Sequence, residues 1–126
     1  MITHPLNQLS KLLCAAAVLS LAACASSQKA PATADVAVSK NAVENAVSAG
    51  AAEAAPEELN AARAKMLRAS QALAAKDYAL ARDLATQAQA DAKLAQSKAN
   101  SAKATAAASA LQEDLRVLRE EVDRAK

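Results

Sequence analysis

The fold is decided by residues 56–92, which have the sequence PEELNAARAKMLRASQALAAKDYALARDLATQAQADA. Proline suits the first position of a helix, and the two acids after Pro56 suit the positive end of the helix dipole. Apolar residues then recur at spacings of three and four, which places them on one helix face: Leu59, Ala62, Met66, Ala69 and Leu73. Lys76-Asp77-Tyr78 predicts a turn, with Asp77 as the N-cap of a second helix.

The helix after this turn carries a face of its own at the same spacings: Ala81, Leu84, Ala88, Ala92, Ala95, Ala99 and Ala102. A short loop makes the two helices antiparallel neighbours. No helix breaker follows Tyr78, so this helix is expected to run nearly to Lys126, about 70 Å, against about 30 Å for the helix that starts at Pro56. Its C-terminal part must therefore project, bend back or find a partner.

A third helix is predicted upstream of residue 56. It is expected to start near Thr33, a suitable N-cap, and to end at Gly50, the only glycine of the chain. A narrow apolar stripe runs along it, formed by Val36, Val43 and Val47.

The composition supports an all-α fold and excludes a thick globular core. The chain has 126 residues, only 1% of them aromatic, and about a third of those after residue 23 are alanine. Alanine has the highest helix propensity and lets helices approach closely, but it buries little apolar area. We therefore expect an alanine-rich helical hairpin or three-helix antiparallel bundle over residues 33–104, with a long C-terminal helix. The 15 basic and 13 acidic residues form no basic stripe, so nucleic acid is not an expected partner.

The C-terminal segment, residues 105–126, has a heptad-like pattern of larger apolar residues, namely Leu111, Leu115, Leu118 and Val122. Its phase does not continue from the preceding alanines, which predicts a shift or a bend within residues 105–110. Two heptads leave three alternatives open: self-association as a coiled coil, packing within the chain, or a solvent-exposed end.

The N-terminus has the organisation of a secretory signal. A start containing Lys11 precedes an apolar run from Leu12 to Leu21 that is too short to span a bilayer. The run ends in Leu21-Ala22-Ala23-Cys24, which resembles the lipobox of bacterial lipoproteins. The resemblance implies cleavage between Ala23 and Cys24, a signal peptide over residues 1–23, and lipidation of Cys24. The alternative is an ordinary signal peptide that leaves a free thiol.

Residues 24–32 are then expected to form the lipidated cysteine and a flexible tether. Two or three acyl chains hold a protein on a membrane almost permanently, because each buried methylene contributes about 0.8 kcal/mol. In lipoproteins sorted by the residue after the cysteine, aspartate causes retention in the inner membrane, and this chain has Ala25. The resemblance therefore implies an outer-membrane protein that faces the periplasm.

Several segments of residues 42–104 resemble the small bacterial lipoproteins of domain-of-unknown-function family 4398. They are residues 42–46 (AVENA), residues 50–59 (GAAEAAPEEL), and residues 77–82 (DYALAR), followed by Ala85, Ala88 and Ala92. The chain departs from the family pattern at Ala54, where an aromatic residue is usual, and at Lys76, where a glycine is usual. The second departure predicts a non-glycine residue in a left-handed conformation, at a cost of about 1 kcal/mol. The family implies a helical envelope lipoprotein with no established activity.

The last residue suggests a second resemblance. Murein lipoproteins are lipidated, alanine-rich helical proteins that end in a lysine joined to peptidoglycan, and this chain ends in Lys126. The resemblance implies Lys126 as a possible attachment site. A lysine at a helix C-terminus is also favoured by the helix dipole alone.

Catalytic residues are scarce. The only histidine is His4, inside the expected signal, so a nucleophile paired with histidine is not available after processing. Without histidine or a free cysteine, neither a metal nor another cofactor is expected. Adjacent carboxylates remain, but neighbouring residues on a helix point about 100° apart. These pairs are Glu57 and Glu58, Glu113 and Asp114, and Glu120 and Glu121.

The sequence thus predicts a non-enzymatic helical spacer or structural element of the bacterial envelope. The alternative is a binding module for an envelope protein or peptidoglycan, with a partner helix lying in a groove along Leu59, Met66 and Leu73. The residues expected to form helix–helix interfaces, within the chain or with a second copy, are Leu59, Met66, Leu73, Leu84, Leu111, Leu115, Leu118 and Val122.

Overall fold

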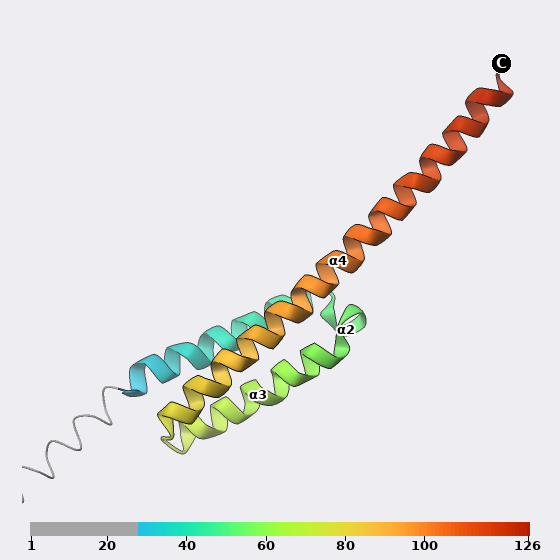
Figure 1. Cartoon of the computed structure of the whole chain (residues 1–126). Helices are drawn as coiled ribbons and strands as arrows, with labels where there is room; N and C mark the ends of the chain where they lie inside the picture. Colours follow the sequence, from blue (N-terminus) through green and yellow to red (C-terminus); the bar gives the residue numbers. More distant parts are fainter. Residues whose placement is uncertain (1–27) are drawn as a thin grey trace, which may run out of the picture.

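The computed structural model describes residues 28–126, which are helical except for short turns. A first helix covers residues 28–48 and is followed by α2 (Ala51–Ala54), α3 (Pro56–Ala74) and α4 (Tyr78–Arg124). The first helix and α4 run in the same direction, and α3 runs antiparallel to both (Figure 1). The prediction of an all-α chain with a long C-terminal helix is confirmed, and the three long helices form a bundle.

The first helix begins earlier than the sequence predicted. Residues 28–32, which were expected to belong to a tether, are helical, so a start near Thr33 is wrong. The Thr33 hydroxyl donates a hydrogen bond to the Lys29 carbonyl at 2.9 Å instead of capping the helix. Proline is compatible with the first turn of a helix, so Pro31 does not mark a boundary. Ala32 is buried against Ala72 and Ala81, and this packing favours the extended helix.

Gly50 ends the first helix as predicted. Its φ of 85° is left-handed, and its N–H donates to the Val47 carbonyl at 2.9 Å. The single turn of α2 follows, which the sequence did not predict, and then α3 begins with Pro56 in its first turn, as expected. The stripe on the first helix differs from the prediction, because Ser39 and Ala46 are buried whereas Val47 is 41% exposed.

The turn between α3 and α4 has the predicted conformation. Lys76 is left-handed, with φ 65°, and is the only non-glycine residue of the described chain with positive φ. The Lys76 N–H donates to Leu73 and the Asp77 N–H donates to Ala72, which is the Schellman pattern of a helix end. The Asp77 carboxylate then accepts from the Leu80 N–H at 3.2 Å and caps α4. This short turn makes α3 and α4 antiparallel neighbours.

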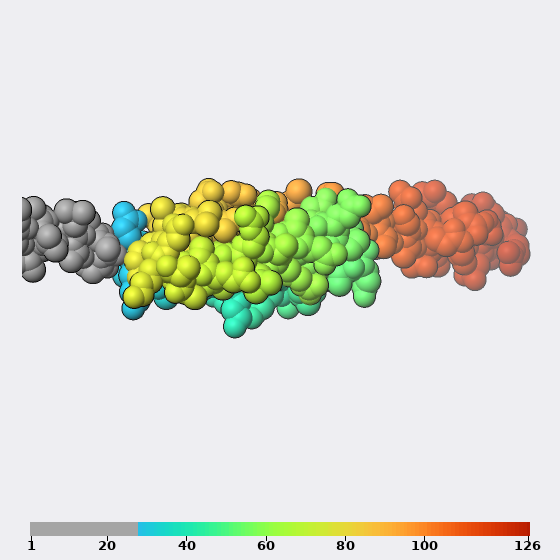
Figure 2. All heavy atoms as spheres, turned by 90° about the horizontal axis from the view of Figure 1, so that it is seen from below, coloured from blue at the N-terminus to red at the C-terminus, as the bar shows by residue number. Residues whose placement is uncertain are grey.

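The core of the bundle consists almost entirely of alanine. The alanines of the predicted face on α4 are fully buried from Ala81 to Ala99, with Leu84 and the unpredicted Ala85 among them. Facing them are Leu59, Ala62 and Ala69 of α3, together with Val43 and Ala46 of the first helix. Methyl side chains keep the helices close together, so the bundle is narrow (Figure 2).

The second half of α4 leaves the bundle. Residues 101–126 are all exposed, including Ala102, which was expected to continue the buried face. A shift or a bend was expected within residues 105–110, but helix α4 is 47 residues long without interruption and no bend occurs. The molecular surface accordingly narrows to a single helix (Figure 2). At 1.5 Å per residue, α4 extends about 70 Å from the end of the bundle at which Ala32 meets Ala81.

Candidate helix–helix interface

The main unpartnered apolar surface lies on the projecting part of α4. Leu111, Leu115, Leu118 and Val122 are 60%, 44%, 56% and 55% exposed, although a helix that packed against the bundle would bury such side chains. Their spacings of four, three and four residues place them on one face. We call this face the tip seam. Leucine and valine side chains exposed in a contiguous row are typical of an interaction surface.

The tip seam continues toward the bundle as smaller residues at the same spacing. The preceding positions are Ala108, Ala104, Ser101, Ser97 and Leu94, all exposed, with Leu94 at 49%. Ser97 and Ser101 each lie two residues, about 200°, from buried Ala99, so they are on the opposite side of α4 from the core. This explains the phase change without a bend, because one straight helix carries two apolar faces. Sequence reasoning missed the second face, although the three-four spacing back to Leu94 was visible.

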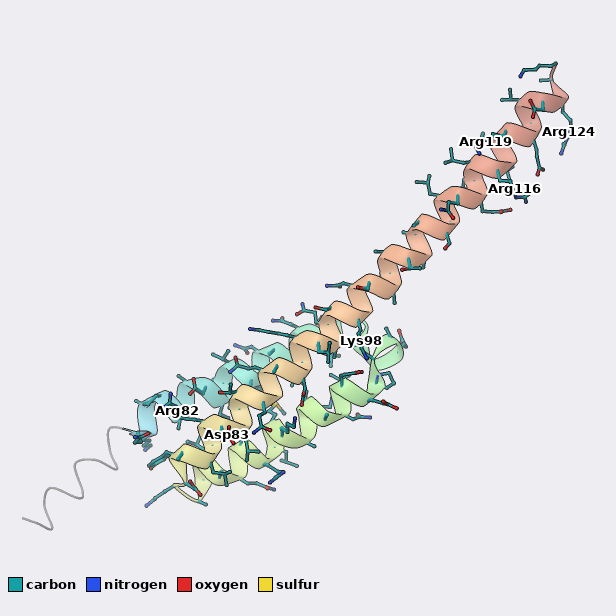
Figure 3. All side chains as sticks on the ribbon, viewed as in Figure 1. Arg82, Asp83, Lys98, Arg116, Arg119 and Arg124 are labelled. Atoms are coloured by element: carbon teal, nitrogen blue, oxygen red, sulfur yellow. The ribbon has the colours of Figure 1, made fainter. Side chains whose placement is uncertain are left out.

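Basic and acidic residues line the tip seam, and three that face away from it are paired with each other. Arg116 forms ion pairs with Glu113, at 2.6 Å, and with Glu120. The Arg116 hydrogen bond lowers the pKa of the Glu113 carboxyl, and the same contact raises the pKa of Arg116. Figure 3 shows Arg116, Arg119 and Arg124 along the projecting part of α4. Within residues 28–126, neither Arg119 nor Asp114 forms a salt bridge.

The predicted interface residues therefore divide into two groups. Leu59 and Leu84 are buried inside the bundle, and Met66 and Leu73 pack partly buried against its core clusters. The groove along α3 that was expected to receive a partner helix is closed by this packing, so that prediction is wrong. The tip seam remains open.

Ion pairs hold the helices of the bundle in register. Lys98 pairs with Glu58 and Lys65 pairs with Asp91 at 2.6 Å, both between α3 and α4. Arg82 of α4 pairs with Asp35 of the first helix at 2.9 Å. The hydrogen bond from Lys98, assisted by a backbone hydrogen bond, lowers the pKa of the Glu58 carboxyl. These carboxylates thus have structural partners along the helix contacts.

The remaining sequence predictions concern chemistry and the membrane. Within residues 28–126, no three histidine, cysteine, aspartate or glutamate side chains are grouped so that they could hold a metal ion. None of the helices in the same range is long and apolar enough to cross a bilayer. Lys126 is exposed, and its Nζ lies 3.5 Å from an Asp123 carboxylate oxygen. Ala23 and Cys24, the predicted cleavage and lipidation sites, lie outside the described residues.

Comparison with known proteins identifies one family. No curated protein and no solved structure matches the chain. A family model matches residues 34–111, which cover α3 and most of the first helix and of α4, and include residues 42–104, where the sequence resemblance was found. The chain therefore belongs to the family described as Domain of unknown function (DUF4398).

Proposed function

We propose that this protein is a non-enzymatic lipoprotein of the bacterial cell envelope. It would be anchored in the outer membrane through Cys24, and its helices would act as a periplasm-facing spacer. The observation that carries the proposal is the position of the two ends. Residue 28 and the end of α4 lie at opposite ends of an elongated molecule (Figure 1). A lipid at Cys24 would therefore place the tip seam far from the membrane that holds the anchor.

The geometry suits a spacer in two further respects. Arg82 of α4 pairs with Asp35, near the start of the described chain, so α4 begins at the end of the bundle that would be next to the lipid. From there its 47 residues extend about 70 Å without a break. The alanine core keeps the bundle narrow, which favours a rod over a surface with pockets. The closed groove on α3 weighs against the alternative that this face binds a partner helix.

Fractionation of cells tests the anchor. Cys24→Ala should move the protein from the membrane fraction to the soluble periplasmic fraction, because no acyl chain can be attached. Cys14→Ala is the matched control, since that cysteine lies inside the expected signal and should leave membrane association unchanged. Ala25→Asp should shift the protein toward the inner membrane in bacteria that sort by this position. Unchanged membrane association of the Cys24→Ala chain would refute the anchor.

A second candidate function is attachment to peptidoglycan, through the exposed amine of Lys126. This side chain is 75% exposed at the far end of the molecule, where a wall-linking enzyme could reach it. Sacculi boiled in detergent and digested with muramidase should release the protein from wild-type cells. They should release none from cells that carry Lys126→Arg, which keeps the charge but removes the primary amine. Absence of the protein from wild-type sacculi would refute the attachment.

A further inference from the structure

We propose that the tip seam pairs with the tip seam of a second copy, in a parallel and in-register two-stranded coiled coil. The proposal goes beyond the anchor and the spacer role, because it names the partner of this surface and its direction. It does not depend on Cys24. It rests on the heptad positions of residues 104–126, on the charges beside them, and on the open side of α4.

The apolar residues occupy both core positions of a heptad repeat. Leu115 and Val122 take position a, and Leu111 and Leu118 take position d. Ala108 and Ala104 continue a and d toward the bundle. Leucine at d combined with a β-branched residue at a favours two strands in parallel coiled coils, and Leu111, Leu118 and Val122 fit this rule whereas Leu115 does not. All four large side chains are about half exposed in the single chain, so they are available for contact with a second copy.

The flanking charges specify the direction of the second helix. In this register Asp114 and Glu121 take position g, whereas Arg119 and Lys126 take position e. A parallel pair brings each g residue next to the e residue five positions further along the other helix. Asp114 then meets Arg119 of the second copy, and Glu121 meets Lys126, which lies two residues beyond the last residue of α4. Both contacts join opposite charges, and the two-fold symmetry makes each of them twice.

An antiparallel pair would have the opposite electrostatics. It brings g next to g and e next to e, so Asp114 and Glu121 of one copy would meet the same acids of the other. Arg119 and Lys126 would likewise meet basic residues. Like charges across an interface disfavour a pairing, so this pattern selects against the antiparallel arrangement.

Charge pairing within the single chain agrees with this assignment. Arg116 takes position b, and its partners Glu113 and Glu120 take position f, so these ion pairs lie on the side away from a partner. In the described chain Asp114, Arg119 and Glu121 form no salt bridge. Lys126 has only a 3.5 Å contact with the Asp123 carboxylate, and both of these side chains are exposed. The charges that a partner would use are thus mostly uncommitted.

The bundle leaves room for the second copy. The tip seam and its continuation through Ser101 and Ser97 lie opposite Ala99, which faces the core. Two copies can therefore place their α4 helices together with both bundles on the outside. Parallel pairing also keeps the N-terminal ends of both copies on the same side, as two chains anchored in one membrane would need.

Cysteine crosslinking in cells that express the full chain tests the register. Leu111→Cys and Val122→Cys, as separate single variants, should each form symmetric disulfide-linked dimers on mild oxidation. These positions are about 16 Å apart along the helix, so an antiparallel pair cannot align both of them with themselves. Glu120→Cys, at outward position f, is the matched control and should stay monomeric, like the unmodified chain. Crosslinks at neither position, or only between the two variants when they are coexpressed, would overturn the proposal.

Charge reversal tests the direction independently. Arg119→Glu places an acid against Asp114 of the second copy and should weaken dimerisation about tenfold, because two attractions become two repulsions. Adding Asp114→Lys restores opposite charges in a parallel pair and should recover the affinity. In an antiparallel pair residues 114 and 119 do not meet, so Arg119→Glu would not weaken dimerisation in the first place. Sedimentation of the purified chain measures both effects. Failure of the double variant to recover the affinity, or a wild-type chain that stays monomeric at high concentration, would overturn the proposal.

Discussion

Replacing Leu59 with alanine is expected to destabilise the bundle by about 3–4 kcal/mol. Leu59 is only 1% exposed and is the largest fully buried side chain in a core made of methyl groups. It packs with Val43 and with alanines such as Ala62, Ala92 and Ala95. Alanine side chains cannot change rotamer to fill the space that the leucine would leave. The cost therefore includes both the lost apolar transfer and a cavity that collapses poorly.

The effect is large relative to the total stability of a small domain, which is about 5–15 kcal/mol. At about 4–8 °C per kcal/mol, the Tm should fall by about 12–32 °C. Urea unfolding of the purified chain, followed by circular dichroism, measures the change. Leu67→Ala is the matched control, because Leu67 lies on the same helix and is 58% exposed. It should change the stability by less than about 0.5 kcal/mol. Equal effects of the two substitutions, or a loss below about 1 kcal/mol for Leu59→Ala, would refute the packing argument.

Three smaller predictions concern the α3–α4 turn and the ion pairs. Lys76→Gly should stabilise the protein by about 0.5–1 kcal/mol in urea unfolding, because glycine relieves the left-handed strain, whereas Ala75→Gly, at helical φ −75°, should destabilise it by a similar amount. Asp77→Ala removes the cap of α4 and should cost about 1 kcal/mol in the same assay; an unchanged midpoint would show that the cap contributes nothing. Because Lys98 lowers the pKa of Glu58 below its ordinary value of 4.5, the stability from this pair is present above that value and is lost as the pH falls through the lower folded pKa. Glu58→Gln should therefore lower the urea midpoint at neutral pH and make no difference once the pH is below both values, and a gap that persists in acid would contradict this account.

Local sequence signals predicted most of the bundle correctly. Gly50, Pro56 and Asp77 each have a specific backbone role. The C-terminal end of the first helix and the starts of α3 and α4 were therefore visible in the sequence. The buried face of α4 was predicted from the three- and four-residue spacing of its apolar residues alone. Lys76 adopts the left-handed conformation that the family resemblance implied, because a glycine is usual at this position in the family.

The errors arose where tertiary packing decides the structure. Pro31 suggested a boundary, but contacts of Ala32 with α3 and α4 favour a helix that starts earlier. Ala46 and Val47 are neighbours in sequence, and the larger apolar side chain suggested that Val47 is the buried residue. The packing of the bundle buries Ala46 instead. The phase change was interpreted as a shift or a bend within residues 105–110, because a single stripe was assumed for α4. The second stripe faces solvent in the single chain, and no contact within the bundle defines it.

The way in which α4 leaves the bundle separates the length of the molecule from its stability. Residues 104–110 are all exposed and mostly alanine, so they act mainly as helical backbone between the core and the tip seam. A seven-residue insertion there would lengthen the rod by about 10 Å and keep the seam on nearly the same face. A four-residue deletion would shorten it by about 6 Å and preserve most of that alignment. Related chains can thus differ in the distance they span while sharing one bundle, and evolution can adjust that distance without altering any buried residue.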